Sequence, residues 1–176
     1  MKKTVLAVLA CIFYLTIVSC GKNDDTPVTD SRYPAQVGSI APDFTLRDVS
    51  GKMSSLSSYR GNVILLEFWA IWCPPCKAAV PDLIALQDKY HGRGFTVIGV
   101  SVDDVGDVTT KVAQFSSAHN INYPVFIADD SVSRLYNVIN IPLSFLISKD
   151  GTIIQSYAGY SYDFHQSVSA QIEKLL

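Results

Sequence analysis

The stretch 63–77 constrains the fold of this chain more than any other part of it. It begins with an apolar run over 63–70 that holds one acid, Glu67, and it ends in two cysteines that enclose two prolines. A run of this length and composition is typical of a strand buried on both faces. Proline is accepted in the first turn of a helix, because the N–H that it lacks would have no intrahelical partner there. We therefore expect a buried strand that leads directly into a helix beginning at Pro74.

Cys73 and Cys76 lie at the start of this expected helix. The N-terminus of a helix offers free N–H groups and the positive end of the helix dipole, and both favour a thiolate at Cys73. Cys76 is three residues further on and lies on the same face, so the two sulfurs can close into a disulfide and reopen. We predict that Cys73 is an exposed nucleophile and that Cys76 is a buried resolving thiol. The alternative is a pair of inert core cysteines, but the two prolines between them are poor core filler.

The composition fits one globular domain. A chain of 176 residues is long enough to bury a sizeable core. The net charge is −2 and there is no dense basic run, which disfavours a nucleic-acid partner. His91, His119 and His165 are scattered, and we interpret them as ordinary surface residues. We therefore predict no metal or haem site.

The N-terminus carries a targeting pattern. Two lysines precede an apolar run over 5–18, which is too short for a comfortable transmembrane helix and suits a signal peptide. Ile17 and Ser19, just before Cys20, resemble a bacterial lipoprotein signal, in which cleavage leaves the cysteine as the lipidated N-terminus. The alternatives are an ordinary signal peptide or an uncleaved anchor, with Cys20 incidental.

The chain is thereby divided into three predicted parts. They are a lipoprotein-type signal peptide over 1–19, a flexible polar tether over 20–37 and a folded domain over 38–176. Of the four cysteines, Cys11 leaves with the signal and Cys20 carries lipid. The mature domain then keeps two thiols, which are too few for a structural zinc site or a disulfide framework.

Hydrophobic periodicity and turn residues divide the domain into short strands and amphipathic helices. A β-hairpin is expected from 41–46 across a turn at 50–52, which supplies two strands. Further strands are expected at 62–70, 95–102, 123–127, 143–147 and 152–157, with the last two joined by a hairpin turn at 149–151. A helical turn is expected at 56–61, and helices from Pro74 to Tyr90, at 107–119, around 132–136 and from Phe164 to Leu175, the last with Ser161 as its N-cap. The order β-β-β-α-β-α-β-α-β-β-α indicates an α/β fold with helices on both faces of a mixed sheet.

Several motifs in this order resemble the thioredoxin superfamily. The likeness is greatest to its membrane-anchored TlpA/ResA type, AhpC/TSA-like extracytoplasmic thiol–disulfide oxidoreductases. The resemblance covers roughly residues 37–176 and lies in 41–46, 68–77, the helix inserted at 107–119, Ile141-Pro142, 145–147 and 150–151. It implies a thioredoxin fold with an N-terminal β-hairpin extension and an inserted helix. It also implies thiol–disulfide exchange with partner proteins, with no cofactor besides the Cys73–Cys76 disulfide.

Glu67 is the most informative residue outside the cysteines. Its apolar neighbours place it inside the sheet, where desolvation should raise its pKa toward neutrality. A carboxyl in that state is suited to relay a proton to or from Cys76. In thioredoxin itself an acid occupies the matching position, whereas several TlpA-type proteins carry a Glu where this chain has Ala79. The alternative is a Glu at a sheet edge, in contact with water or paired with a lysine.

Pro142 resembles the cis-proline that the family places beside its active site. A cis X–Pro bond marks a tight, specific loop, and the backbone of Ile141 would then pair with an extended substrate segment. The alternative is a trans proline that opens a strand. We expect Trp69 in the core and Trp72 exposed near Cys73, and we assign substrate binding to Trp72, Pro74, Pro75, Ile141 and Pro142.

The resemblance implies reduction of disulfides in partner proteins, such as the cysteine pairs of apocytochrome c, with electrons supplied by a membrane thiol protein. Oxidising active sites often carry a histidine between the two cysteines, whereas this chain has only prolines there, so we favour a reductase. A peroxiredoxin-like peroxidase is one alternative, but Leu66 and Ala70 stand where Pro-x-x-x-Thr/Ser-x-x-Cys requires a proline and a hydroxyl. A copper-binding chaperone on the same fold is another, but the cysteine spacing is one residue short.

Overall fold

The fold is described by a computed structural model over residues 34–104 and 106–176. The predicted signal peptide, Cys11, Cys20 and most of the tether lie outside these residues. The elements, in chain order, are β1 (Thr45–Arg47), β2 (Met53–Ser55), the 3-10 helix η1 (Leu56–Tyr59), β3 (Val63–Trp69), α1 (Pro74–Tyr90), the 3-10 helix η2 (His91–Arg93), β4 (Phe95–Ser101), α2 (Val108–Ala118), β5 (Val125–Ile127), α3 (Asp130–Leu135), β6 (Leu143–Ile147), β7 (Ile153–Ala158) and α4 (Phe164–Leu175). The predicted order of strands and helices is confirmed.

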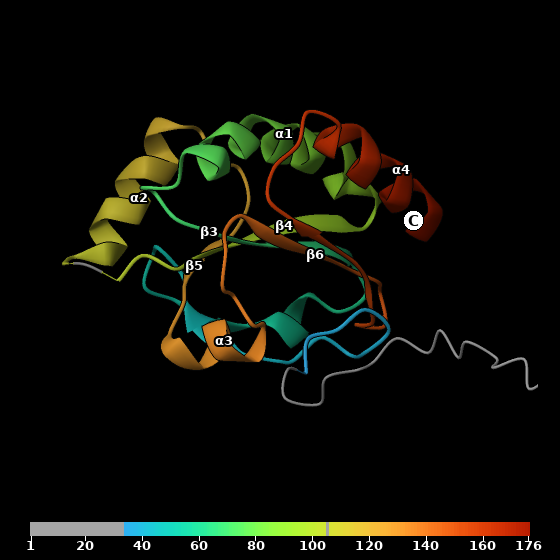
Figure 1. The fold of residues 1–176 in the computed structure, drawn as a ribbon, viewed down its shortest axis with the longest axis horizontal. Coiled ribbons are helices and arrows are strands. Elements are labelled where there is room, and N and C mark those ends of the chain that lie inside the picture. The colour runs from blue at the N-terminus through green and yellow to red at the C-terminus, as the bar shows by residue number, and fades with distance from the viewer. Residues whose placement is uncertain (1–33, 105) are drawn as a thin grey trace, which may run out of the picture.

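A five-stranded mixed sheet forms the centre of the domain (Figure 1), with the strand order β5-β4-β3-β6-β7. β3 pairs parallel to β4 and antiparallel to β6. β5 is parallel to β4, and β7 is antiparallel to β6. Because β3 is the middle strand, every one of its residues is buried, which explains why the run 62–70 is almost entirely apolar.

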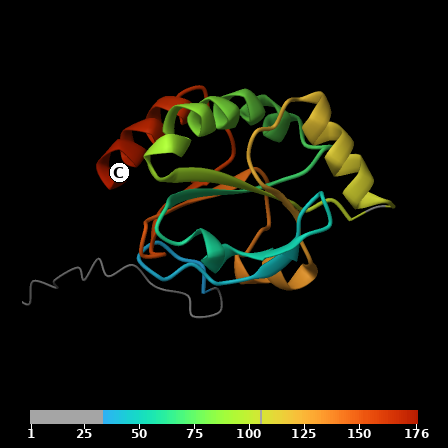
Figure 2. The same ribbon diagram turned by 180° about the vertical axis from the view of Figure 1, so that it is seen from behind.

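Alternate residues of β3 face two separate hydrophobic clusters. Val63, Leu65 and Trp69 pack with α1, α2 and α4 on one face. Ile64, Leu66 and Phe68 pack with the β1–β2 hairpin, η1 and α3 on the other. Figures 1 and 2 show this arrangement from opposite sides, with α1, α2 and α4 together across the sheet from α3. The predicted α/β class, with helices on both faces of a mixed sheet, is confirmed.

Three local predictions need correction. The first strand runs over Thr45–Arg47 and not over 41–46, because Pro42 has no N–H to donate to a strand partner. Asp163, not Ser161, occupies the N-cap position of α4, and the Ser161 hydroxyl donates a hydrogen bond to the Asp163 carboxylate at 2.7 Å. The serine is therefore used to hold the acid rather than to cap the helix directly. β5 begins at Val125, not at residue 123, because Pro124 has no N–H to donate to a strand partner.

Within residues 34–104 and 106–176, no helix is long and apolar enough to cross a membrane.

Candidate functional site

The cysteine pair lies where the central strand gives way to α1. Cys73 is the N-cap of this helix, Pro74 and Pro75 occupy its first turn, and the backbone N–H of Cys76 donates to Cys73 Sγ at 3.2 Å. Cys73 and Cys76 form a disulfide with a Cα–Cα distance of 5.3 Å. The predicted sequence of buried strand, cysteine pair and helix is therefore present. Cys73 lies at the positive, N-terminal end of the dipole of α1.

The expectation that Cys73 is exposed is wrong for the disulfide form. Cys73 is 2% exposed and Cys76 is 1% exposed. The bond to Cys76 turns Cys73 Sγ toward the protein, and the carbonyl oxygen of Ile141 lies 3.9 Å from it. Trp72, Pro74 and Pro75 are exposed around the buried disulfide. Because only a free thiolate can attack a partner, Cys73 must first be released from its bond to Cys76.

The loop that carries Pro142 approaches the cysteines from far along the chain. The Ile141–Pro142 peptide bond is cis, so the trans alternative is wrong. Pro142 is buried, and its carbonyl accepts a hydrogen bond of 2.8 Å from the N–H of Gly159. The fold thus brings Ile141 and Pro142 to the disulfide, together with the exposed Trp72.

Asp103 also supports this site, and sequence reasoning missed it. Its Oδ2 accepts hydrogen bonds from the backbone N–H of Ile71 at 3.0 Å and from the Ser101 hydroxyl at 2.8 Å. Asp103 therefore holds the loop that precedes Cys73. A signal was available, because Asp103 follows a strand parallel to β3, and the carboxyl ends of parallel strands meet at one edge of a sheet.

Glu67 is buried in the middle of the sheet, 1% exposed. Its carboxylate accepts a hydrogen bond from the hydroxyl of Ser144, its partner across the β3–β6 pair. Burial raises the pKa of Glu67 to about 7, and the Ser144 bond only partly opposes this shift. The prediction of a buried carboxyl with a pKa near neutrality is confirmed, and the alternative of a solvated edge residue is wrong.

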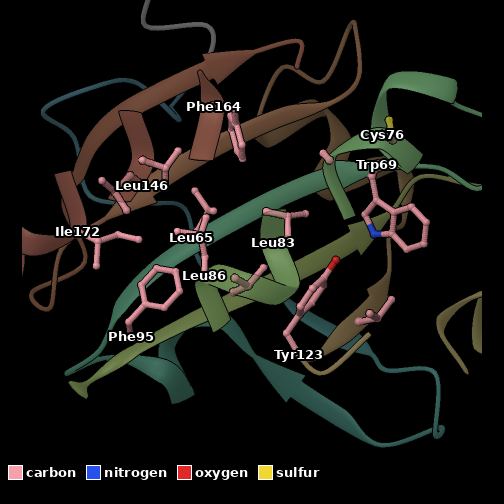
Figure 3. Packing of buried hydrophobic residues seen from close by; sticks show 14 of the residues in the cluster. Leu65, Trp69, Cys76, Leu83, Leu86, Phe95, Tyr123, Leu146, Phe164 and Ile172 are labelled. Carbon is pink, nitrogen blue, oxygen red and sulfur yellow. The ribbon is translucent and has the colours of Figure 1, made fainter. Parts of the chain in front are cut away.

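A glycine lies on the other side of Glu67. Gly99 is its partner in β4, and a Cβ there would lie 3.0 Å from Trp69 Nε1 and 3.3 Å from Tyr123 Cε2. Burial, and to a smaller extent the charge of Glu67, raise the pKa of Tyr123 well above its usual range. In Figure 3 the Trp69 ring lies between Cys76 and the Tyr123 ring, within the hydrophobic cluster on the α1 face of the sheet. The missing side chain at position 99 thus lets two aromatic rings close over the strand beside the carboxyl.

The model of the AhpC/TSA family matches this chain over residues 37–156. The chain belongs to the AhpC/TSA family. This AhpC/TSA-family chain is 34% identical to the thiol-disulfide oxidoreductase ResA of Geobacillus kaustophilus over 159 residues, which make up 90% of each chain. The thioredoxin-like protein YneN of Bacillus subtilis is 32% identical over 124 residues, 70% of this chain and 72% of YneN.

A solved structure extends this likeness to the fold. A thiol:disulfide interchange protein of the thioredoxin family from Chlorobium tepidum matches with a TM-score of 0.70 and 27% identity, covering 80% of this chain and 97% of that one. The AhpC/TSA-family chain is therefore a thiol–disulfide oxidoreductase with a thioredoxin fold, and the resemblance inferred from its motifs is confirmed.

Proposed function

We propose that this protein reduces disulfides of partner proteins outside the cytoplasm, through Cys73 and Cys76, while a lipid on Cys20 holds it at a membrane. The observation that carries the proposal is the Cys73–Cys76 disulfide at the N-cap of α1, beside Ile141 and the cis peptide of Pro142. A disulfide that closes only three residues of chain adds little to stability, so its use is chemical.

The reaction consists of two exchanges that begin from the dithiol form. The thiolate of Cys73 attacks one sulfur of the partner's disulfide, forming a mixed disulfide while the partner's other sulfur leaves as a thiolate. The thiolate of Cys76 then attacks Cys73 Sγ, which closes the disulfide seen here and releases the second partner thiol. The partner keeps the two electrons that it gains, and a thiol protein at the membrane supplies a new pair of electrons, which reduces the Cys73–Cys76 disulfide again.

The two sulfurs differ in their surroundings, which sets this order. Cys73 Sγ accepts the N–H of Cys76 at the end of a helix dipole, and both interactions stabilise its thiolate. Cys76 is buried among hydrophobic side chains, where a thiol keeps its proton more strongly. Cys76 therefore needs a base before it can act as the resolving nucleophile.

We assign Glu67 as the base that accepts the thiol proton of Cys76. It lies on the face of β3 that α1 covers, and its pKa of about 7 lets it take or give a proton near neutral pH. Within the described residues its carboxylate accepts a hydrogen bond from the neutral Ser144 hydroxyl and forms no ion pair, so no cation fixes it in its charged form. Ala79, which is buried on α1, contributes no acid.

Partner binding is assigned to the surface around the disulfide. The backbone of Ile141 would pair with an extended segment of the partner, with Trp72, Pro74 and Pro75 exposed beside it. The family resemblance supports apocytochrome c cysteine pairs as substrates. The prolines between the cysteines favour the reducing direction.

A peroxidase receives no support from the geometry. Leu66 packs on the hairpin face of the sheet, away from α1, and Ala70 is buried without a hydroxyl to offer a peroxide. Thiol–disulfide exchange is therefore favoured over the peroxiredoxin-like reaction.

Trapping tests the proposed function directly. Cys76→Ser cannot resolve the mixed disulfide, so we expect it to accumulate covalently bound partners on Cys73 that mass spectrometry identifies. The matched control, Cys73→Ser, should trap none. Insulin reduction, peroxide turnover and copper titration on the wild-type protein separate the three candidate activities. Absence of exchange with any disulfide or dithiol would refute the proposal.

A further inference from the structure

A small pocket adjoins the redox site on the side of α2. Its volume is about 140 Å³, and it is lined by Ile71, Trp72, Asp103, Asp104, Val108 and Lys111. Trp72 precedes Cys73 and is 63% exposed, so the pocket begins one residue from the nucleophile, a Cα–Cα distance of about 3.8 Å. A partner joined to Cys73 would therefore place a neighbouring side chain over this pocket.

The wall of the pocket is largely hydrocarbon. Ile71 and Val108 are partly buried and pack against the α1 face of the core. Trp72 supplies an exposed indole that no ring or cation contact occupies within the described part of the chain. Such a wall favours the carbon stem of a long side chain rather than a small polar group.

Carboxylates dominate the charge of the pocket. Asp103 is only 9% exposed, and both of its side-chain hydrogen bonds are accepted by Oδ2. Its Oδ1 accepts none from the described residues, so a buried carboxylate lining the pocket keeps a free oxygen. Asp104 adds a second, exposed carboxylate.

The lysine at the pocket does not cancel this charge. Lys111 Nζ lies 3.2 Å from the position that a Cβ on Gly106 would take. Hydrogen bonds from Thr110 lower the pKa of Asp107, and the charge of Lys111 lowers it further. Lys111 lines the pocket together with Asp103 and Asp104, so one ammonium group faces two carboxylates and the pocket keeps a net negative charge.

We propose that this pocket binds a lysine or arginine side chain that lies next to, or two residues from, the reactive cysteine of the partner. The carbon stem would lie on Ile71 and Val108, and the cationic head would meet Asp103 and Asp104 beside the indole of Trp72. Neighbouring residues of an extended segment are about 3.3 Å apart, which keeps such a side chain within reach while the partner cysteine is bonded to Cys73. This inference rests on the proposed function and narrows its substrate class to cysteines flanked by a basic residue.

Peptide disulfides test the pocket. The substrates are symmetrical peptide disulfide dimers, identical except for Lys, Leu or Glu at one position within two residues of the cysteine. The full-length protein is used in its dithiol form, and each turnover oxidises Cys73 and Cys76 while one dimer becomes two peptide thiols. We expect the second-order rate constant for oxidation of the dithiol protein by the Lys dimer to exceed that for the Glu dimer by about 5- to 10-fold, with Leu between them, and the ratio to shrink at high salt.

Two variants isolate the pocket from general charge effects. Asp104→Asn should reduce the Lys-to-Glu ratio by about 3-fold. Asp130→Asn, which removes an exposed carboxylate from α3 on the opposite face of the sheet, should leave the ratio unchanged. Moving the variable residue five positions from the cysteine should abolish the preference.

The possible outcomes separate this inference from the proposed function. Equal rates for the three dimers, a preference for Leu, or a Lys preference that Asp104→Asn and Asp130→Asn affect alike would overturn the pocket assignment while leaving disulfide reduction intact. Failure to reduce any dimer, and insulin as well, would instead overturn the proposed function.

Discussion

Outside the cysteines, Glu67 is the residue on which the predictions about stability and proton transfer depend, because its carboxyl is buried. The apolar neighbours of Glu67 are enough to predict that its carboxyl lies inside the sheet, because a side chain within an apolar run on a central strand does not contact water. Its partner could not be predicted, since Ser144 lies in β6 and reaches Glu67 only through an antiparallel register. The burial of Cys73 in the disulfide form was missed for a similar reason, because the covering carbonyl of Ile141 comes from a distant loop.

Glu67 should make the oxidised protein less stable as pH rises. Its ordinary pKa is 4.5 and its folded pKa is about 7, so between these values the folded protein holds a proton that the unfolded chain has lost. The stabilisation is complete below about pH 4.5 and is lost as pH rises through about 7, a loss on the order of 3 kcal/mol. Urea unfolding across this range measures it.

The control for this pH dependence is a surface acid. Glu67→Gln should flatten the profile, whereas Glu173→Gln should not, because the pKa of Glu173 is lowered by its bond to Arg93 and its carboxyl is ionised throughout. Parallel profiles for wild type and Glu67→Gln would show that Glu67 does not take up a proton on folding.

The same substitution tests the proton relay. At pH 7, Glu67→Gln should slow release of the partner by Cys76 on the order of 10²-fold, because the amide cannot accept the thiol proton. First attack by Cys73 should change little, since Cys73 is activated at the helix N-terminus. Stopped-flow mixing with a peptide disulfide resolves the two steps. Equal slowing of both steps, or of neither, rules out the relay.

At the scale of elements, the strands and helices could be predicted because each has a clear hydrophobic period. The residues 164, 168 and 172 recur at helical spacing and are buried in α4, and β3 and β4 are continuous apolar runs buried throughout. The ends of elements were harder to predict, because caps depend on local hydrogen bonds. At α4, for example, the N-cap is Asp163 and not the predicted Ser161. Asp103 escaped prediction because its role depends on how two strands end side by side.

A side chain at Gly99 should destabilise the domain, although Gly99 lies in a regular strand. In Gly99→Ala the new Cβ would lie 3.0 Å from Trp69 Nε1 and 3.3 Å from Tyr123 Cε2, so one of these two buried rings would have to shift within the core. We expect a loss of about 1–3 kcal/mol in the free energy of unfolding. Gly92→Ala is the matched control, because a Cβ there meets nothing within 4 Å, and it should be neutral or stabilising. Equal stabilities of the two variants would contradict this packing account.

At the scale of the whole molecule, the topology can be predicted from the order of the elements and from the motifs. Which elements cover each face of the sheet cannot be predicted in this way. The order predicts a mixed sheet, whereas only the structure shows that α1, α2 and α4 share the face that bears Glu67 and Cys76, and that α3 and the hairpin cover the other. This separation places the redox chemistry on one face and the N-terminal hairpin on the opposite one. The segment from residue 34 that leads into the domain packs on the hairpin face, and therefore joins the domain on the face opposite α1, the helix that carries the cysteines.

The lipid on Cys20 is the prediction that concerns the whole molecule, and Cys20 lies outside the described residues. Cys20→Ala should move the protein from the membrane fraction to the soluble fraction, because acyl chains supply about 0.8 kcal/mol of membrane affinity for each buried CH₂ group. Fractionation after carbonate extraction, with incorporation of labelled fatty acid, measures both the position and the modification. Cys11→Ala is the matched control and should remain labelled and membrane-bound, because Cys11 belongs to the predicted signal peptide. If the wild type incorporates no labelled fatty acid, or if Cys20→Ala incorporates as much as the wild type, the lipoprotein assignment is wrong.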